Sequence, residues 1–156
     1  MKIEKFEDIK AWQEARKLVS EIYKITDSKT FRKDFGLRDQ ARRSSVSIMA
    51  NIAEGFDSKS KLEFAHFLTY AQRSASETQS HIYVALDQKY IADEEFQKIY
   101  QQTIYIKNLI GAFMRYLAHN PKKHDSDATE VREYCSTAAH FHPTGAREHG
   151  STGAQL

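Results

Sequence analysis

Cysteine, proline and glycine are all scarce in this chain of 156 residues, and each shortage narrows the possible folds. The single cysteine, Cys135, has no partner for a disulfide within one chain, which fits a reducing compartment. Both prolines, Pro121 and Pro143, come late, so residues 1–120 contain no helix breaker of that kind. We therefore expect long helices up to Asn120 and a boundary directly after it.

Long hydrophobic runs are also missing. No apolar stretch approaches the roughly 18 residues that a membrane-spanning helix needs. The first five residues include charges, but no apolar segment follows them, so no secretory signal is predicted. We expect a cytoplasmic protein without membrane association. The formal net charge of +2 does not indicate nucleic-acid binding unless the basic residues are clustered.

Sequence motifs that carry catalysis or hold cofactors are absent. The chain lacks HExxH, the phosphate-binding GxxxxGK[ST], GxGxxG and CxxC. His140 and His142 are too few to define a metal site, and Cys135 has no histidine beside it in a predicted element. The serines at 44, 45 and 47 have no general base that the sequence places near them. We therefore expect no catalytic residues, no metal and no cofactor.

Hydrophobic periodicity predicts an all-α fold, an antiparallel up-and-down four-helix bundle over residues 1–120. The predicted helices span residues 7–26, 35–54, 61–88 and 93–120. Ser60 with Glu63 has the form of a capping box, and Asp93 is the expected N-cap of the last helix. Gly55 is the expected left-handed C-cap of the second helix.

The first helix has a clear division between polar and apolar sides. Charges of alternating sign are spaced by three and four residues, which predicts a solvated stripe. The stripe consists of Lys10, Glu14, Lys17, Glu21 and Lys24. Trp12 lies on the opposite side, where we expect it to anchor the core.

The second and fourth helices carry apolar residues on more than one side. No charge occurs from Ser44 to Ala53, and a second apolar strip is predicted opposite the core face of the last helix. Because one bundle interior buries only one side of a helix, we expect a homo-oligomer. The candidate interface residues are Val46, Met49, Ala53, Tyr105, Leu109, Ala112 and Tyr116.

Residues 121–156 are predicted to form a peripheral, partly disordered tail. Residues 127–139 could make one short helix, because Val131, Tyr134 and Cys135 share a side. The remainder is rich in Gly, Ser, Thr and His and offers too little apolar area to order itself.

One stretch of the second helix is more specific than amphipathic packing requires. It resembles the signature of the four-helix-bundle family named for proteins encoded in intervening sequences of 23S ribosomal RNA genes. The matching residues are Gln40, Arg42, Arg43, Ser47, Ile48, Asn51, Ile52, Ala53, Glu54 and Gly55. Residues 6–15 and 67–77, the latter with Ser74 and Glu77, look like two further segments of that family. Ser44 and Arg73 depart from it, since Ala and Gly are usual there.

The resemblance implies a four-helix bundle that assembles into a ring, with five copies as the expected number. The family is similar to the accessory variability determinants of diversity-generating retroelements, which work with a reverse transcriptase and its RNA. No enzymatic activity is implied. The expected partners are therefore a second copy of the chain, RNA, and a reverse transcriptase or another nucleoprotein.

Basic residues around the signature are the candidate nucleic-acid contacts. They are Arg38, Arg42, Arg43, Lys59, Lys61 and Arg73. Phosphate contact is one interpretation, and solvated or ion-paired arginines are the other. The leading hypothesis is an oligomeric, non-enzymatic scaffold that contacts structured RNA. The alternative is a purely protein–protein accessory module, for example a reverse-transcriptase accessory subunit.

Overall fold

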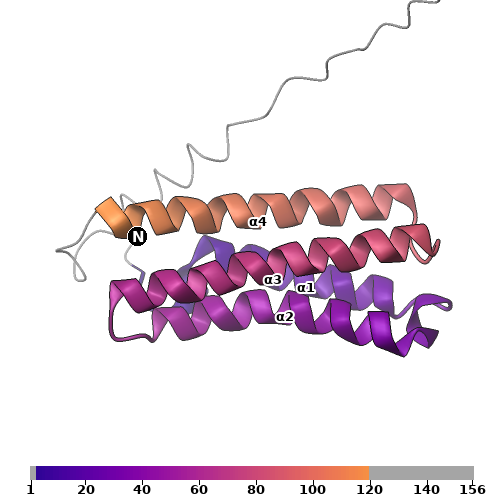
Figure 1. The fold of residues 1–156 in the computed structure, drawn as a ribbon, viewed down its shortest axis with the longest axis horizontal. Helices are drawn as coiled ribbons and strands as arrows, with labels where there is room; N and C mark the ends of the chain where they lie inside the picture. Colours follow the sequence, from indigo (N-terminus) through magenta and orange to yellow (C-terminus); the bar gives the residue numbers. More distant parts are fainter. Residues whose placement is uncertain (1–2, 120–156) are drawn as a thin grey trace, which may run out of the picture.

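Four long helices form the part of the chain that the computed structural model describes, residues 3–119. They are α1 (Lys10–Thr26), α2 (Phe35–Phe56), α3 (Lys61–Asp87) and α4 (Asp93–His119). Figure 1 shows them as an elongated, antiparallel bundle with short connections. The all-α four-helix prediction is confirmed. The tail from residue 120 onward, including the short helix predicted at 127–139, lies outside the described residues.

The bundle has up-and-down topology, and its four helices occupy the corners of a square in cross-section. Each helix packs against the helices that precede and follow it in sequence, and α4 also packs against α1. The α1–α2 and α3–α4 connections lie at one end of the bundle (Figure 1). The α2–α3 connection and the end of α4 lie at the other. The contact between α2 and α3 is the most extensive of the four.

The core is a column of aliphatic side chains along the bundle axis. Each helix contributes residues at spacings of three and four, as an amphipathic helix requires. The fully buried members include Leu18, Ile22, Ile48, Ile52, Leu68, Ile82, Ile106 and Ile110. Trp12 is only half-buried; its ring packs edge-on against Phe6, 5.2 Å between centroids.

The helix starts follow the predicted signals with small shifts. The Ser60 side chain accepts a hydrogen bond from the backbone N–H of Glu63 at 3.1 Å, while the Glu63 carboxylate accepts from the N–H of Lys59 at 3.3 Å. Asp93 is the first residue of α4 rather than its N-cap. The first predicted helix begins later than expected, at Lys10, after a short 3-10 helix at Phe6–Asp8.

Gly55 does not have the predicted left-handed conformation, because no described glycine has a positive φ and α2 continues through it to Phe56. A Cβ at Gly55 would lie 2.6 Å from Cδ2 of Phe64 and 2.8 Å from Cβ of Phe67. The glycine is therefore required by the close approach of α3 to α2, and the C-cap prediction is wrong.

The turn between α3 and α4 contains the only described non-glycine residue with a positive φ, Lys89 at 59°. Its N–H donates to the carbonyl of Leu86, and the N–H of Tyr90 donates to the carbonyl of Ala85, both at 2.8 Å. These two bonds form a Schellman motif, in which glycine is usually found at the position of Lys89. The turn therefore holds a lysine in a backbone conformation that costs it free energy.

Glu14 is not part of a solvated stripe as predicted. Its side chain is 11% exposed and lies between Lys10 and Lys17, whose Nζ atoms are 2.8 and 2.9 Å from Oε1. Burial raises the pKa of this carboxyl, but the two lysine hydrogen bonds outweigh that effect and leave the pKa below its ordinary value. The buried charge is therefore paired.

The apolar strip predicted on the outside of α4 is largely inside the bundle. Leu109 and Ala112 are 2% and 1% exposed, and Tyr105 and Tyr116 are partly buried. Since α4 packs against both α1 and α3, a wide arc of its surface is covered within one chain. A neighbouring copy is not needed to bury Leu109 or Ala112, so their predicted outward placement is wrong; an interface role for Tyr105 and Tyr116 stays a prediction.

The α2 half of the predicted interface remains accessible. Val46 is 40% exposed, while Met49 and Ala53 are half-buried. Val46 is the most exposed of the three, whereas Met49 packs partly against the core. Whether a second copy covers them stays a prediction.

Candidate nucleic-acid interface

The six predicted basic residues do not form one patch within a chain. Arg38, Arg42 and Arg43 lie in the first half of α2, near the α1–α2 connection. Lys59 and Lys61 lie at the α2–α3 turn, the opposite end of the bundle (Figure 1). Arg73 lies in the middle of α3, where its guanidinium carbon is 5.8 Å from the centre of the Tyr70 ring. A single chain therefore brings only Arg38 and Arg42 onto one face, with Arg43 at the same end of the bundle.

Arg42 is fixed between α2 and α1. Its Nε donates a hydrogen bond of 2.8 Å to Oγ1 of the buried Thr26. Its guanidinium carbon lies 4.6 Å from the centre of the Tyr23 ring. These contacts hold the cation against α1, and the Tyr23 side chain remains 46% exposed beside it.

Arg38, one turn earlier on α2, also lies over an aromatic ring, but its polar contacts differ from those of Arg42. Its Nη2 and Nε contact the Oδ1 atom of Asp39 at 2.7 and 2.8 Å, and its Nη1 donates to the backbone carbonyl of Arg32 at 3.3 Å. Its guanidinium carbon is 4.8 Å from the centre of the Phe35 ring. Arg38 is thus ion-paired, as the alternative interpretation of these arginines expected. The Phe35 side chain is 65% exposed.

Arg43 points away from the other two arginines. Its Nη2 donates to Oε1 of Gln40 at 3.2 Å, and its side chain is exposed on the α3 side of α2. There its charge acts on His81 of α3 and helps to lower the pKa of that imidazole. Arg43 is thus available to an anionic partner, but on a different face from Arg38 and Arg42.

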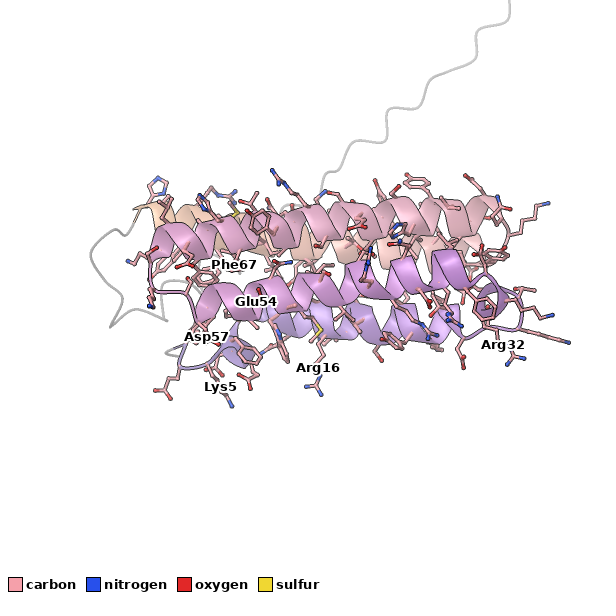
Figure 2. The ribbon with its side chains drawn as sticks, turned by 60° about the horizontal axis from the view of Figure 1, so that its bottom comes forward. Lys5, Arg16, Arg32, Glu54, Asp57 and Phe67 are labelled. Atoms are coloured by element: carbon pink, nitrogen blue, oxygen red, sulfur yellow. The ribbon has the colours of Figure 1, made fainter. Side chains whose placement is uncertain are left out.

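Further cations at the same end were not singled out in the sequence. Exposed Lys24, Lys29, Arg32 and Lys33 lie on α1 and the α1–α2 connection. Counting residues 24–43, seven Lys and Arg against three Asp give a charge of +4, although the whole chain carries only +2. Figure 2 shows Arg32 extending away from the bundle at this end. The sequence alone would have indicated this cluster, as a local excess of positive charge in residues 24–43.

Acidic residues occupy the neighbouring corner of the same end. Asp87 closes α3, and Asp93, Glu94 and Glu95 form the first turn of α4. The two corners are joined where the Phe31 ring stacks on Tyr90, 5.1 Å between centroids, and the Tyr90 hydroxyl donates to Asp34. Although Lys89 lies in the α3–α4 turn, the net positive charge of this end therefore lies on the α1–α2 side.

A second polar cluster lies inside the α2–α3 contact. The Ser44 hydroxyl is 3.2 Å from Nδ1 of His81 and accepts a hydrogen bond of 3.0 Å from the hydroxyl of Thr78. Burial lowers the pKa of His81, and this effect exceeds the opposite effect of the Glu77 carboxylate, which raises it; the positive charge of Arg43 lowers it further. The structure thus supplies a base that sequence analysis did not place beside Ser44.

This cluster does not have the geometry of a nucleophilic site. Ser44 is 2% exposed and lies within α2, where backbone N–H groups are engaged in the helix. A substrate carbonyl carbon cannot approach the buried Oγ, and the engaged backbone N–H groups are not free to stabilise an oxyanion, as acyl transfer requires. The network instead satisfies polar groups at a close helix contact.

Of the remaining residues of the family signature, some lie at helix contacts and the others lie on the surface. Asn51 donates to the carbonyl of Ser47 at 2.7 Å, and the carbonyl of Ser74 accepts from Thr78 at 2.9 Å. Glu54 is exposed on the outside of α2 (Figure 2). Glu77 is exposed on α3. Packing explains the small residues, and nothing in the structure explains Glu54.

Other kinds of site are not evident in residues 3–119. No helix of this part is long and apolar enough to cross a bilayer. The same residues contain no group of three or more His, Cys, Asp or Glu side chains arranged to hold a metal ion. Every buried side-chain nitrogen or oxygen there has a hydrogen-bond partner.

Comparison with known proteins identifies relatives of undetermined function. A solved structure from Bacteroides thetaiotaomicron, described as a protein with unknown function from the S23 ribosomal protein family, superposes with a TM-score of 0.62. It is 25% identical in sequence, and the match covers 67% of this chain and 98% of that one. No functionally curated protein matches the chain. The profile of the 23S rRNA-intervening sequence proteins matches residues 7–112, and the chain therefore belongs to this family.

Proposed function

We propose that this protein is a non-enzymatic, cytoplasmic scaffold that binds structured RNA through the basic end of its bundle. One observation carries the proposal: residues 24–43 concentrate a charge of +4 at one corner of a chain whose total is +2. We define the basic end as the exposed cations of this segment. They are Lys24, Lys29, Arg32, Lys33 and Arg43.

The chemistry of these residues favours phosphate as the ligand. Lysine and arginine neutralise phosphates and release counterions, which makes such binding strongly dependent on salt. Arg32, Lys33 and Lys29 form no ion pair with any described residue, whereas Arg38 is bound to Asp39. These three cations of the basic end are therefore available to bind phosphate groups of a ligand.

Self-assembly forms the second part of the proposal. Val46 at 40% exposure lies in a stretch of α2 without charge, beside the half-buried Met49 and Ala53. We expect a second copy of the chain to cover this strip, in a ring of five as family membership suggests.

The RNA claim is tested by anisotropy titrations of a labelled, folded RNA at several salt concentrations. Wild type should bind with an affinity that falls steeply with salt. Replacing Arg32, Lys33 and Arg43 together by Gln should weaken binding to every RNA and flatten the salt dependence. A matched control replaces Lys59 and Lys61, at the opposite end, and should bind as wild type. Equal binding by both variants, or no binding by wild type, contradicts the proposal and leaves the protein–protein accessory role.

The assembly claim is tested by sedimentation equilibrium. Val46→Asp should lower the mass of the assembly while the bundle stays helical, because Val46 is not part of the core. Leu109→Asp is unsuitable, since it places a charge in the core and should unfold the chain. A wild-type mass equal to one 18.0 kDa chain at micromolar concentration would contradict self-assembly.

A further inference from the structure

We propose that the basic end binds unpaired nucleotides by stacking their bases on Phe35 and Tyr23, rather than reading the phosphates of a duplex. This inference rests on the proposed RNA binding and specifies the form of RNA that is bound. It is carried by two ring–arginine pairs, each with an exposed aromatic ring, that are neighbours on the surface.

The two ring–arginine pairs form one continuous row. Arg38 and Arg42 are four residues apart on α2, so their side chains are neighbours on one helix face. Phe35 lies under Arg38 at 4.8 Å, and Tyr23 of α1 lies under Arg42 at 4.6 Å. The order along the surface is therefore ring, guanidinium, guanidinium, ring. All four groups are planar and can stack on a base.

Phe35 has no packing role that explains its presence. It is the first residue of α2, and the N-terminus of that helix is already capped by Asp34, whose Oδ1 accepts from the N–H of Leu37 at 3.0 Å. Its side chain is 65% exposed, the second-largest exposure among the large hydrophobic side chains of residues 3–119 after Leu62. One side of the ring meets Arg38, which leaves the rest of the ring to solvent.

The arginines are held in place before any ligand binds. Asp39 fixes Arg38 through two contacts, and the carbonyl of Arg32 accepts from its third nitrogen. Thr26 fixes the Nε of Arg42. Because Asp39 neutralises Arg38, this guanidinium serves as a flat surface rather than as a free cation. Arg32 and Lys33, both exposed beside it, supply the charge for phosphates.

Unpaired RNA is the ligand that this combination fits. Bases in a duplex are stacked on one another and cannot lie on protein rings, whereas single strands, loops and bulges can. Stacking on aromatic side chains with cations alongside is the usual way in which proteins hold single strands without reading their sequence. The two other ring–arginine pairs, Trp12 with Arg16 and Tyr70 with Arg73, are isolated from this row.

The test compares a fluorescein-labelled 12-nucleotide oligo(A) RNA with a 12-base-pair RNA duplex, titrated with the full chain. Phe35→Ala should weaken oligo(A) binding about 5- to 100-fold, the effect of losing one stacked base, and leave duplex binding unchanged. Its salt dependence should not change, because no phosphate contact is lost. Phe35→Trp should bind as wild type, and Phe35→Leu should bind as weakly as the alanine variant.

Tyr70→Ala is the matched control, because Tyr70 is 48% exposed and also lies beside an arginine, but outside the row. It should bind both RNAs as wild type. Equal losses for oligo(A) and duplex in Phe35→Ala, or full rescue by Phe35→Leu, would overturn the stacking inference while RNA binding stands. A smaller sedimenting mass for Phe35→Ala would also overturn it, since Phe35 would then contact a second copy. Absence of binding to either RNA by wild type contradicts the proposed function itself.

Discussion

Gly55→Ala offers the sharpest check of the packing between α2 and α3. An added Cβ would lie 2.6 Å from Cδ2 of Phe64 and 2.8 Å from Cβ of Phe67. Real Cβ contacts are not that short, and the Cβ of Phe67 is attached directly to the α3 backbone. The methyl group therefore cannot be accommodated by a rotamer change alone. The two helices must move apart or the Phe64 ring must leave its place.

The expected magnitude follows from two opposing effects. Alanine is favoured over glycine inside a helix by about 1 kcal/mol. Forcing a methyl group into a filled core costs about 1–3 kcal/mol, and the upper part of this range, about 2–3 kcal/mol, applies here because the space is closed on two sides. We expect Gly55→Ala to lower the free energy of unfolding by roughly 1–2 kcal/mol, with a fall in Tm of about 3–8 °C for a bundle of this size.

Two other helical glycines provide controls of opposite sign. A Cβ at Gly111 would meet only the tips of Arg115 and Gln72, both at 3.5 Å, and one at Gly36 would lie 3.8 Å from Asp34. Both replacements by alanine should stabilise the protein, by about 0.5–1 kcal/mol. Urea unfolding followed by circular dichroism measures all three. The reasoning is refuted if Gly55→Ala is as stable as Gly111→Ala.

Two further predictions concern the α3–α4 turn and the partly buried His81. Lys89→Gly should raise the free energy of unfolding by up to about 1 kcal/mol in the same urea assay, because glycine adopts a positive φ without strain; a loss of stability would contradict this. Since burial lowers the pKa of His81, the unfolded chain binds its proton more readily. Stability should therefore be complete above about pH 6.5 and fall as the pH drops below it. His81→Gln should flatten this part of the pH profile, and an unchanged slope would show that another group is responsible.

Local signals were sufficient to predict the helices. Ser60 and Asp34 cap helices through hydrogen bonds to residues three positions later, and such bonds depend only on nearby sequence. Gly55 shows where local reasoning fails: a glycine near a helix end suggests a left-handed cap, but the cause here is contact with Phe64 and Phe67 of the next helix. Leu109 was misplaced for a similar reason, because the width of the buried arc of α4 depends on how α1 and α3 flank it.

The candidate site was predictable only in outline. The excess of positive charge in residues 24–43 can be counted in the sequence. The contact of Arg42 with Tyr23 joins two helices across the α1–α2 connection, so no spacing rule reveals it. The pairing of Arg38 with Asp39 also separates a structural arginine from the available ones, although both kinds look alike in sequence.

The buried hydroxyls between α2 and α3 have a consequence for the uniqueness of the fold. Several buried residues of these helices are small, among them Ala41, Ala71 and Ala75. Small side chains interlock little, so they distinguish poorly between alternative axial positions of α3 along α2. Displacing α3 by one turn, about 5.4 Å, would break the hydrogen bond between Thr78 and Ser44 and the contact of Ser44 with His81. Each hydroxyl would keep only its bond to a carbonyl of its own helix. The polar pair thus selects one register among several that the apolar residues alone would allow.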